Sequence, residues 1–258
     1  MEKKGKKILI GIGKGCLQIV ASFFVLAAAW WIAYLSAGND LLVPPLSVCL
    51  KRAVLLIGEA WFWAGFGATF LRVLIAFALA FVFGVVFAVV SYLLPWFRRF
   101  FSPIASILRS LPVLAVLLIL LVAMGTENAP VAVAFLSLFP MLYTSTLTAL
   151  LGVDSQLTEM SKVYNVPIWK RVAFLYLPQI SPYLIREGGA ALSFSLKLVV
   201  SAEVIANTYE SLGGLMQEAR VSYEMPNLFA LVILTFLAAL LLEGITALIA
   251  AAVERRVK

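Results

Sequence analysis

The sequence predicts an all-α protein that crosses a membrane about six times. Of its 258 residues, 63% are hydrophobic and only 13% are charged, whereas a soluble domain carries about 45–50% apolar and about 25% charged residues. Each long apolar run is close to the roughly 20 residues that an α-helix needs to cross a bilayer. Lysine and arginine collect in short clusters between these runs. No soluble core can hide this much apolar side chain, so most of the surface must face lipid.

Six spans are expected within a single transmembrane domain that covers residues 1–258. They are residues 16–37, 64–92, 104–124, 130–151, 182–205 and 228–252. The first span follows a lysine-rich start, but it is too long for a signal core, ends in interfacial aromatic residues and lacks a small-residue cleavage site. We therefore expect it to be a retained first helix, with the core helices lying within residues 64–252.

Residues 41–60 differ from the spans because they mix charged and aromatic side chains after a Pro-Pro pair. This composition predicts an amphipathic helix that lies at the outer membrane interface. Two stripes of small residues recur at every fourth position, which predicts close packing between helices. They are Ala76, Ala80, Gly84 and Ala88, and Ala29, Ala33 and Ala37.

The distribution of basic residues predicts that both termini lie in the cytoplasm. With this orientation the outer side receives only Lys51, Arg52 and Arg220, and two basic residues, Arg72 and Lys197, fall within spans. The cytoplasmic side receives the other basic residues, including Arg98, Arg99 and Arg109. Such a bias is typical of multi-pass proteins of the prokaryotic cytoplasmic (inner) membrane.

The composition also argues against several functions. The net charge of +7 is spread over membrane loops, which disfavours nucleic-acid binding. The chain has no histidine and only two cysteines, Cys16 and Cys49, which the predicted topology places on opposite sides of the membrane. Neither a disulfide between them nor a metal site is expected, and a membrane-embedded enzyme would need a convergent catalytic constellation that the scattered carboxylates do not supply.

The longest loop on the predicted cytoplasmic side, residues 154–181, reads as two short helices joined by a sharp turn. Asp154 can cap a first helix that runs to Tyr164. Asn165 stands where that helix must turn, and asparagine tolerates the left-handed conformation better than any residue except glycine. Pro167 suits the first turn of a second helix, which Leu177-Pro178 is expected to close. On the residues alone, an interfacial hairpin without a partner and a docking site for a partner protein are equally supported.

The spacing in this loop resembles the coupling motif of permeases from binding-protein-dependent ABC importers. That motif consists of Glu-Ala-Ala, three residues, Gly, nine residues, Ile, any residue and Leu-Pro. Glu159 stands at the Glu position, Met160-Ser161 replace the two alanines, and Asn165 replaces the glycine. Leu175 stands at the Ile position, and Leu177-Pro178 complete the motif at the correct spacing.

Other segments resemble the nitrate, sulfonate and taurine branch of the same family, from about residue 41 to the C-terminus. They are Leu42-Val43-Pro44-Pro45, Ala68-Thr69-Phe70-Leu71-Arg72, Arg109-Ser110-Leu111-Pro112 and Val200-Ser201-Ala202-Glu203, followed by Ser211-Leu212-Gly213-Gly214-Leu215. The resemblance implies a type I ABC importer permease (MetI-like) fold. It also implies a non-catalytic subunit whose substrate is a small anion such as sulfonate, taurine, nitrate or bicarbonate, with a pyrimidine or vitamin precursor as the alternative.

The resemblance further implies a set of partners for this chain. They are a second permease copy, two cytosolic ATP-binding subunits, an extracytoplasmic solute-binding protein and the lipid bilayer. ATP and Mg would bind to the ATPase subunits and no cofactor to this chain, whose nearest phosphate-loop sequence, at Gly13-Lys14, lacks the required residues. The residues expected to couple to the ATPases are Asp154, Leu157, Glu159, Met160, Ser161, Tyr164, Asn165, Pro167, Leu177 and Pro178.

Charged residues inside spans are costly and tend to face cavities or partners. The candidates for the translocation pathway are Arg72, Tyr143, Ser193, Ser195, Lys197 and Glu203. Arg72 or Lys197 could guide an anion. Alternatively, Lys197 and Glu203 pair with each other or snorkel near the outer interface, and Arg72 pairs with Glu203 or anchors the helix near the interface. A secondary transporter is a more distant alternative, because it would need coupling-ion carboxylates at mid-membrane and often repeated halves, and no half-repeat is visible.

Overall fold

The structure is a computed structural model that describes residues 24–25, 27–36, 38–39 and 42–257, with the backbone alone for residues 254–257. Its described part contains helices and no strands. In chain order they are α2 (Leu46–Leu56), α3 (Ala60–Leu93), α4 (Pro95–Ser110), α5 (Val113–Leu151), α6 (Ser155–Val163), α7 (Ile168–Arg171), the π-helix η1 (Val172–Tyr176), α8 (Leu177–Ala206), α9 (Leu212–Val221) and α10 (Met225–Val257).

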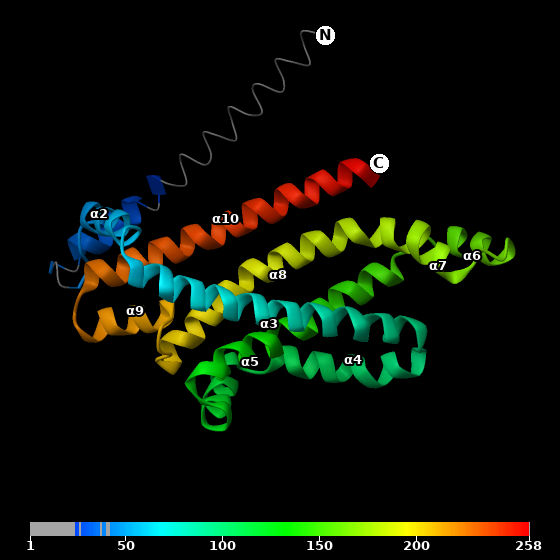
Figure 1. The fold of residues 1–258 in the computed structure, drawn as a ribbon, viewed down its shortest axis with the longest axis horizontal. Coiled ribbons are helices and arrows are strands. Elements are labelled where there is room, and N and C mark those ends of the chain that lie inside the picture. Colours follow the sequence, from blue (N-terminus) through cyan, green and yellow to red (C-terminus); the bar gives the residue numbers. More distant parts are fainter. Residues whose placement is uncertain (1–23, 26, 37, 40–41, 258) are drawn as a thin grey trace, which may run out of the picture.

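The helices form an elongated bundle with two distinct ends (Figure 1). Helices α3, α8 and α10 run along its length, while α6 and α7 project at one end and α2 and α9 lie at the other. Four of the helical segments are long and apolar enough to cross a membrane: Ala60–Leu93, Val113–Leu151, Ile168–Ala206 and Met225–Val253. This confirms the prediction of an all-α membrane protein.

The first predicted span is described only in part. Residues 24–25 and 27–36 are helical, and the rest of the predicted helix 16–37, including Cys16 and Ala37, lies outside the described residues. Trp30 donates a hydrogen bond to the carbonyl of Pro44 at 3.2 Å and packs edge-on against Phe229 of α10. This segment therefore contacts the α2–α9 end of the bundle. Ala29 and Ala33 are exposed, so these two members of the predicted stripe are not buried against other described residues.

The third span differs from the prediction. It was expected at residues 104–124. Instead, α4 already begins at Pro95, runs back along α3 and ends at Ser110, and the helical conformation is interrupted at Leu111. Leu111 is extended (φ −66°, ψ 132°) because the ring of Pro112 disfavours a helical conformation in the residue before it. Arg109 consequently lies near the end of α4 that is remote from α6 and α7. Arg109 therefore does not lie on the same side of the bundle as Arg98 and Arg99, which are near the start of that helix, although all three were predicted to lie on the cytoplasmic side.

A second break separates the third span from the fourth. Gly125 has φ 76° and ψ 176°, a conformation that a residue with a Cβ seldom adopts. It divides α5 into a helix over residues 113–124 and a longer helix over residues 126–151. The second of these helices corresponds to the predicted fourth span, 130–151, while the predicted third span, 104–124, is divided between α4 and the first of them.

The fifth span is longer than predicted. Leu177-Pro178 do not close the second helix of the loop, because α7 continues through η1 into α8 as one helical rod over Ile168–Ala206. Proline at 178 has no N–H to offer the carbonyl four residues earlier. The wider π turn of Val172–Tyr176 lies directly before it and keeps the helix continuous. The rod ends at Asn207, which adopts the left-handed conformation (φ 51°, ψ 48°).

The small residues of α3 mark its tightest packing. Ala76, Ala80, Gly84 and Ala88 are all buried, as their spacing predicts. A Cβ at Gly84 would lie 3.0 Å from Cβ of Leu142 and 3.1 Å from the backbone nitrogen of Tyr143. The backbones of α3 and α5 therefore approach closely at this position, as small residues allow in membrane helices.

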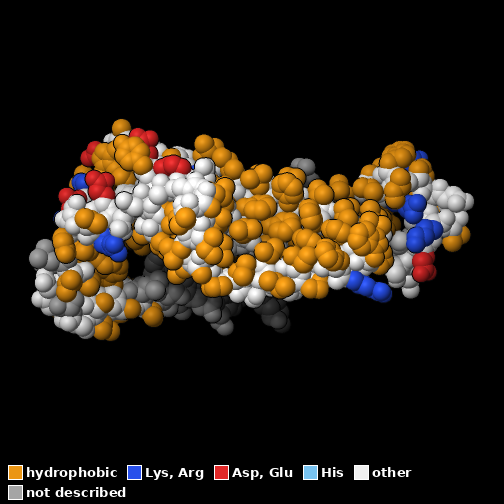
Figure 2. Space-filling view, turned by 90° about the horizontal axis from the view of Figure 1, so that it is seen from below, with side chains coloured by type: hydrophobic (Ala, Val, Ile, Leu, Met, Phe, Trp, Pro, Cys, Tyr) orange, Lys and Arg blue, Asp and Glu red, His pale blue; other side chains and the backbone are white. Residues whose placement is uncertain are grey.

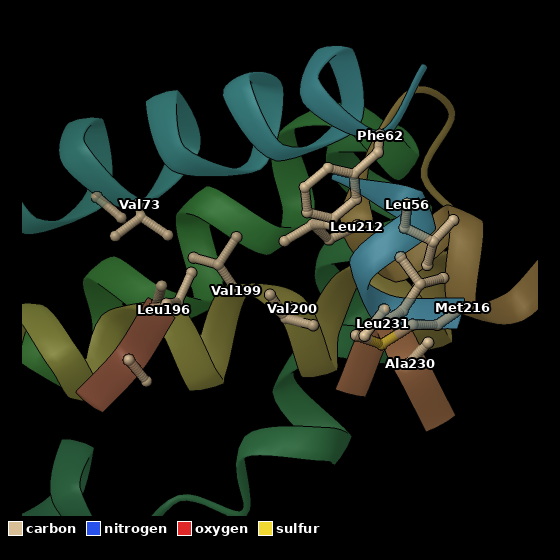
Figure 3. Close-up of a cluster of buried hydrophobic side chains, with 14 residues drawn as sticks. Leu56, Phe62, Val73, Leu196, Val199, Val200, Leu212, Met216, Ala230 and Leu231 are labelled. Carbon is tan, nitrogen blue, oxygen red and sulfur yellow. The ribbon is translucent and has the colours of Figure 1, made fainter. Parts of the chain in front are cut away.

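A hydrophobic cluster holds the α2–α9 end together (Figure 3). Side chains from α2, α3, α8, α9 and α10 converge there, among them Leu56, Phe62, Val199, Met216 and Leu231. By contrast, most large side chains on the outer faces of α3 and α10 are apolar and exposed. Figure 2 shows one such face, where hydrophobic side chains cover the middle of the molecule and most charged side chains gather toward its two ends. This distribution suits a protein whose middle lies in lipid.

The two adjacent glycines of α8 provide a matched test of helix packing. A Cβ at Gly189 would lie 2.5 Å from Cβ of Thr246 on α10, whereas a Cβ at Gly188 would meet only the rings of Phe81 and Phe77, at ordinary distances of 3.5 and 3.9 Å. We expect Gly189→Ala to push α8 from α10 and to cost about 1–3 kcal/mol of stability. Gly188→Ala should leave the melting temperature of the detergent-purified protein nearly unchanged. Equal melting temperatures for the two variants would contradict this packing.

Candidate functional site

The first helix of the projecting hairpin begins as the sequence predicts. The carboxylate of Asp154 accepts hydrogen bonds from the backbone N–H groups of Gln156 (2.8 Å) and Leu157 (3.4 Å). This N-cap satisfies donors that the first turn would otherwise leave free. The backbone N–H of Asp154 donates to Oε1 of Gln179 at 3.1 Å, which ties the start of α6 to the first turn of α8.

The turn after α6 confirms the structural prediction for Asn165. This residue has φ 49°, and its N–H donates to the carbonyl of Lys162 at 2.9 Å while that of Val166 donates to Ser161 at 3.0 Å. These two bonds form a Schellman motif, in which the left-handed residue is usually glycine. Asparagine therefore replaces glycine here without changing the path of the chain.

The hairpin presents an apolar surface that no other part of the described chain covers. Neither α6 nor α7 contains a buried residue, and Met160, Val163 and Tyr164 are 54%, 77% and 73% exposed. Leu157, Ile168, Trp169 and Phe174 are also exposed. Contiguous apolar surface of this kind marks a site of interaction with a protein or a membrane.

A second site, which is polar, lies in the membrane-spanning part, around the carboxylate of Glu203 on α8. This residue is fully buried. It accepts hydrogen bonds from the hydroxyl of Thr69 at 2.8 Å, from Nη1 of Arg72 at 3.1 Å and from the backbone N–H of Gly213 at 3.3 Å. A Cβ at Gly213 would overlap the Cβ of Glu203, so glycine is required for this approach. Helices α3, α8 and α9 thus meet at one carboxylate.

Arg72 extends this site to α5. Its Nη2 pairs with Oε2 of Glu127 at 2.5 Å, just beyond the break at Gly125, and Thr208 donates a hydrogen bond to the carbonyl of Thr126 at 2.9 Å. The pairing of Arg72 with Glu203 was one of the alternatives from the sequence. The sequence analysis missed Glu127, which lies between two predicted spans and carries no pattern that links it to Arg72. It also gave no role to Thr69, although Thr69 lies in the segment that resembles the transporter family.

The remaining pathway candidates do not gather at one cavity. Tyr143 is fully buried, and its hydroxyl lies 3.0 Å from that of Ser91 and 3.3 Å from that of Ser102. Ser195 is buried and donates to the carbonyl of Val73 at 3.5 Å, while the buried hydroxyl of Ser193 has no partner among the described residues. Lys197 alone of these candidates lines an open groove, and it does not pair with Glu203. That these residues line the translocation pathway stays a prediction.

The described residues bring no three His, Cys, Asp or Glu side chains together in a way that could hold a metal ion. The geometry instead combines a projecting hairpin, a continuous helical rod that connects it to the bundle, and a buried polar cluster at the far end of that rod. Such an arrangement can bind a partner at one end and transmit its movement through the membrane. It defines a membrane-embedded transport subunit.

Comparisons with known proteins agree with this class. Residues 80–258 match the family described as "Binding-protein-dependent transport system inner membrane component". Because the match covers more than half of the chain, the protein belongs to this family. It is accordingly a non-catalytic permease subunit of an ABC transporter of the importer type, a class that works with ATPase and binding-protein partners.

Two curated relatives support the assignment. A probable ABC transporter permease of Brucella melitensis is 27% identical over 225 residues, which cover 86% of this chain and 87% of the relative. The taurine transport system permease protein TauC of Escherichia coli is 25% identical over 207 residues, covering 78% of this chain and 75% of TauC. The second likeness agrees with the branch that the sequence motifs resemble.

Solved structures show the same fold. An inward-facing structure of the MetNI methionine ABC transporter superposes with a TM-score of 0.66 at 20% identity, covering 75% of this chain and 96% of the other. An amino acid ABC transporter crystallised with histidines gives a TM-score of 0.63 at 16% identity, covering 79% and 96%. These likenesses confirm the predicted type I, MetI-like architecture.

Glu203 and Glu127 provide a matched test of the polar cluster. We expect Glu203→Gln to lower the free energy of unfolding by about 3 kcal/mol, because the buried hydrogen-bond donors around this residue lose the carboxylate that accepts from them. Glu127→Gln should cost less than about 1 kcal/mol, because Glu127 is 53% exposed and such pairs contribute little. Thermal unfolding of the detergent-purified variants would measure both. A larger loss for Glu127→Gln would contradict the central place of Glu203.

The turn at Asn165 can be tested with two substitutions. Asn165→Gly should be neutral or slightly stabilising, since glycine adopts a positive φ without strain. Asn165→Val should strain the turn by about 1–2 kcal/mol and increase proteolysis between α6 and α7. Limited proteolysis followed by mass spectrometry would show this, and equal cleavage of the two variants would count against the Schellman turn.

Proposed function

We propose that this chain is one of two identical permease chains in an importer for a small solute, with an anion such as a sulfonate, taurine, nitrate or bicarbonate as substrate. Two cytosolic subunits bind ATP and Mg and hydrolyse the nucleotide, and an extracytoplasmic binding protein delivers the solute. The chain lies in the prokaryotic inner membrane with both termini and the α6–α7 hairpin in the cytoplasm.

The observation that carries this proposal is the uncovered apolar surface of the hairpin, at Met160, Val163 and Tyr164. It projects from the end of the bundle and has the spacing of a coupling motif centred on Glu159. A cytosolic ATPase subunit with a complementary cleft would bury this surface. The ten predicted coupling residues, Asp154 to Pro178, all belong to the hairpin or to the start of α8.

The rod supports a direct mechanical link between the ATPases and the pathway. Ile168–Ala206 contains 39 residues, which at about 1.5 Å per residue extend roughly 58 Å. When ATP draws the two ATPases together, they move the hairpins, and each rod tilts within its chain. The passage between the two chains then opens toward the loaded binding protein, and hydrolysis resets it.

The substrate class rests on the motif resemblance and on the similarity to TauC. One feature favours the alternative, a neutral or cationic compound such as a pyrimidine or vitamin precursor. A cavity of about 680 Å³ at the α2–α9 end is lined by Glu210 and Glu218 and by no basic side chain of the described residues, a lining that favours a neutral or cationic solute over an anion. The ligand that co-purifies with the binding protein would decide between the two.

We expect the intact complex, extracted in mild detergent, to contain two copies of this chain and two ATPase subunits. Met160→Asp should abolish ATPase binding without lowering the melting temperature of the isolated chain, because no described residue buries this side chain. Ser155→Asp is the control, since it adds the same charge at a favourable helix start. Intact-mass measurement of the three preparations tests the proposal. A single copy without ATPase in several detergents would contradict it.

A further inference from the structure

Lys197 occupies an unusual position for a charged residue. It precedes the end of α8 at Ala206 by nine positions, which places it about 13 Å along the helix from that end. Its side chain is exposed, and the two ion pairs among the described side chains both belong to Arg72. A lysine at this depth is therefore left without a carboxylate partner among the described side chains.

The face of α8 that carries Lys197 is the part of this helix left open by the bundle. Of the four candidate spans, the one that contains α8 is the most buried, with 61% of its most apolar stretch inside the structure against 28% or less in the others. The open positions recur at helical spacing: Ala190, Phe194, Lys197 and Ser201. Charged side chains within a span avoid lipid and face a cavity or a partner, so this face of α8 borders water or a second chain.

A groove of about 270 Å³ lies beside Lys197. Its walls come from α8 and from the start of α5 and are apolar except for Lys197 and Ser201; the other lining residues are Val113, Leu114, Leu117, Phe194, Leu198 and Ala202. No carboxylate of the described residues lines the groove. Apolar walls lower the local dielectric constant and strengthen the field of the single ammonium group.

We propose that Lys197 attracts the anionic group of the transported solute, a carboxylate, sulfonate or similar oxyanion, into a water-filled passage along this groove. The inference rests on the proposed function, because two identical chains would place two Lys197 side chains beside one passage with no groove carboxylate to neutralise them. Arg72 does not share this role, since Glu203 and Glu127 already compensate its charge. Lys197 thus selects for the charge of the solute, while the binding protein selects its shape.

The test measures the sign of the potential in the groove without knowledge of the substrate. Ser201→Cys places a thiol one helical turn from Lys197, in a background with Cys16→Ser and Cys49→Ser. Cys49 is itself buried, and burial raises the pKa of its thiol. The complex in proteoliposomes is treated with an anionic reagent, 2-sulfonatoethyl methanethiosulfonate, and with its cationic trimethylammonium counterpart, in the presence and absence of ATP. Each thiolate forms a mixed disulfide and releases methanesulfinate.

We expect Lys197→Gln to lower the ratio of anionic to cationic modification rates at position 201 by at least about fivefold, from the loss of one unit charge at close range. Lys197→Arg should preserve the ratio. A ratio that Lys197→Gln leaves unchanged would overturn the proposal. The proposal is also overturned if the thiol at position 201 reacts with neither reagent in either nucleotide state, while Ser222→Cys, at the exposed α2–α9 end, reacts normally.

Mass analysis of the same preparations separates the inference from the proposed function. A chain that purifies without ATPase subunits contradicts the proposed function, whatever the rate ratio. A complex that contains them but shows no charge effect contradicts the role of Lys197 alone. Retained ATPase activity in the Lys197→Gln complex shows that a changed ratio does not result from a failure to assemble.

Discussion

The buried carboxylate of Glu203 is the interaction on which the arrangement of the bundle depends. It accepts hydrogen bonds from α3 and from the backbone at the start of α9, and through Arg72 it reaches the second half of α5. In lipid there is no hydrophobic drive to hold helices together, so small-residue contacts and polar bonds must do so. Burial of a charge is costly unless it is paired and fully hydrogen-bonded. Glu203 meets this condition only when α3, α8 and α9 are all in place, and the site therefore specifies one arrangement of these helices.

The rod from Ile168 to Ala206 connects this cluster to the opposite end of the molecule. Glu203 lies near one end of the rod, and the hairpin with its Schellman turn at Asn165 leads into the other. A proline at 178 would normally end or kink a helix, but the π-helical turn that precedes it keeps the rod continuous. The protein thus combines one continuous helix with an anchor near its end, the polar cluster around Glu203. In the proposed function, this combination carries a movement of the ATPases to the far side of the membrane.

The charged residues inside the membrane divide into two groups with different surroundings. Arg72 and Glu203 compensate each other within the chain, with Glu127 as a further partner, and their energetics belong to folding. Lys197 has no such partner in the part of the chain that the structure describes, and it lies in an apolar groove on the open face of the most buried span. The cost of an unpaired charge at this depth is high in lipid and low in water. The position of Lys197 consequently points to a surface that becomes complete in the assembled transporter.

The sequence by itself determined the class of protein, its all-α membrane-spanning fold and the local form of the hairpin. These follow from composition, from apolar run length and from short-range rules such as the cap at Asp154 and the left-handed turn at Asn165. It did not locate the break at Leu111 or the continuity of the helix through Pro178, because the effect of a proline depends on how the neighbouring backbone is packed. Nor did it choose between Arg72 and Lys197 as the partner of Glu203, or find Glu127. Residues 72, 127 and 203 are far apart in the chain, and only the packing of α3, α5 and α8 brings their side chains together.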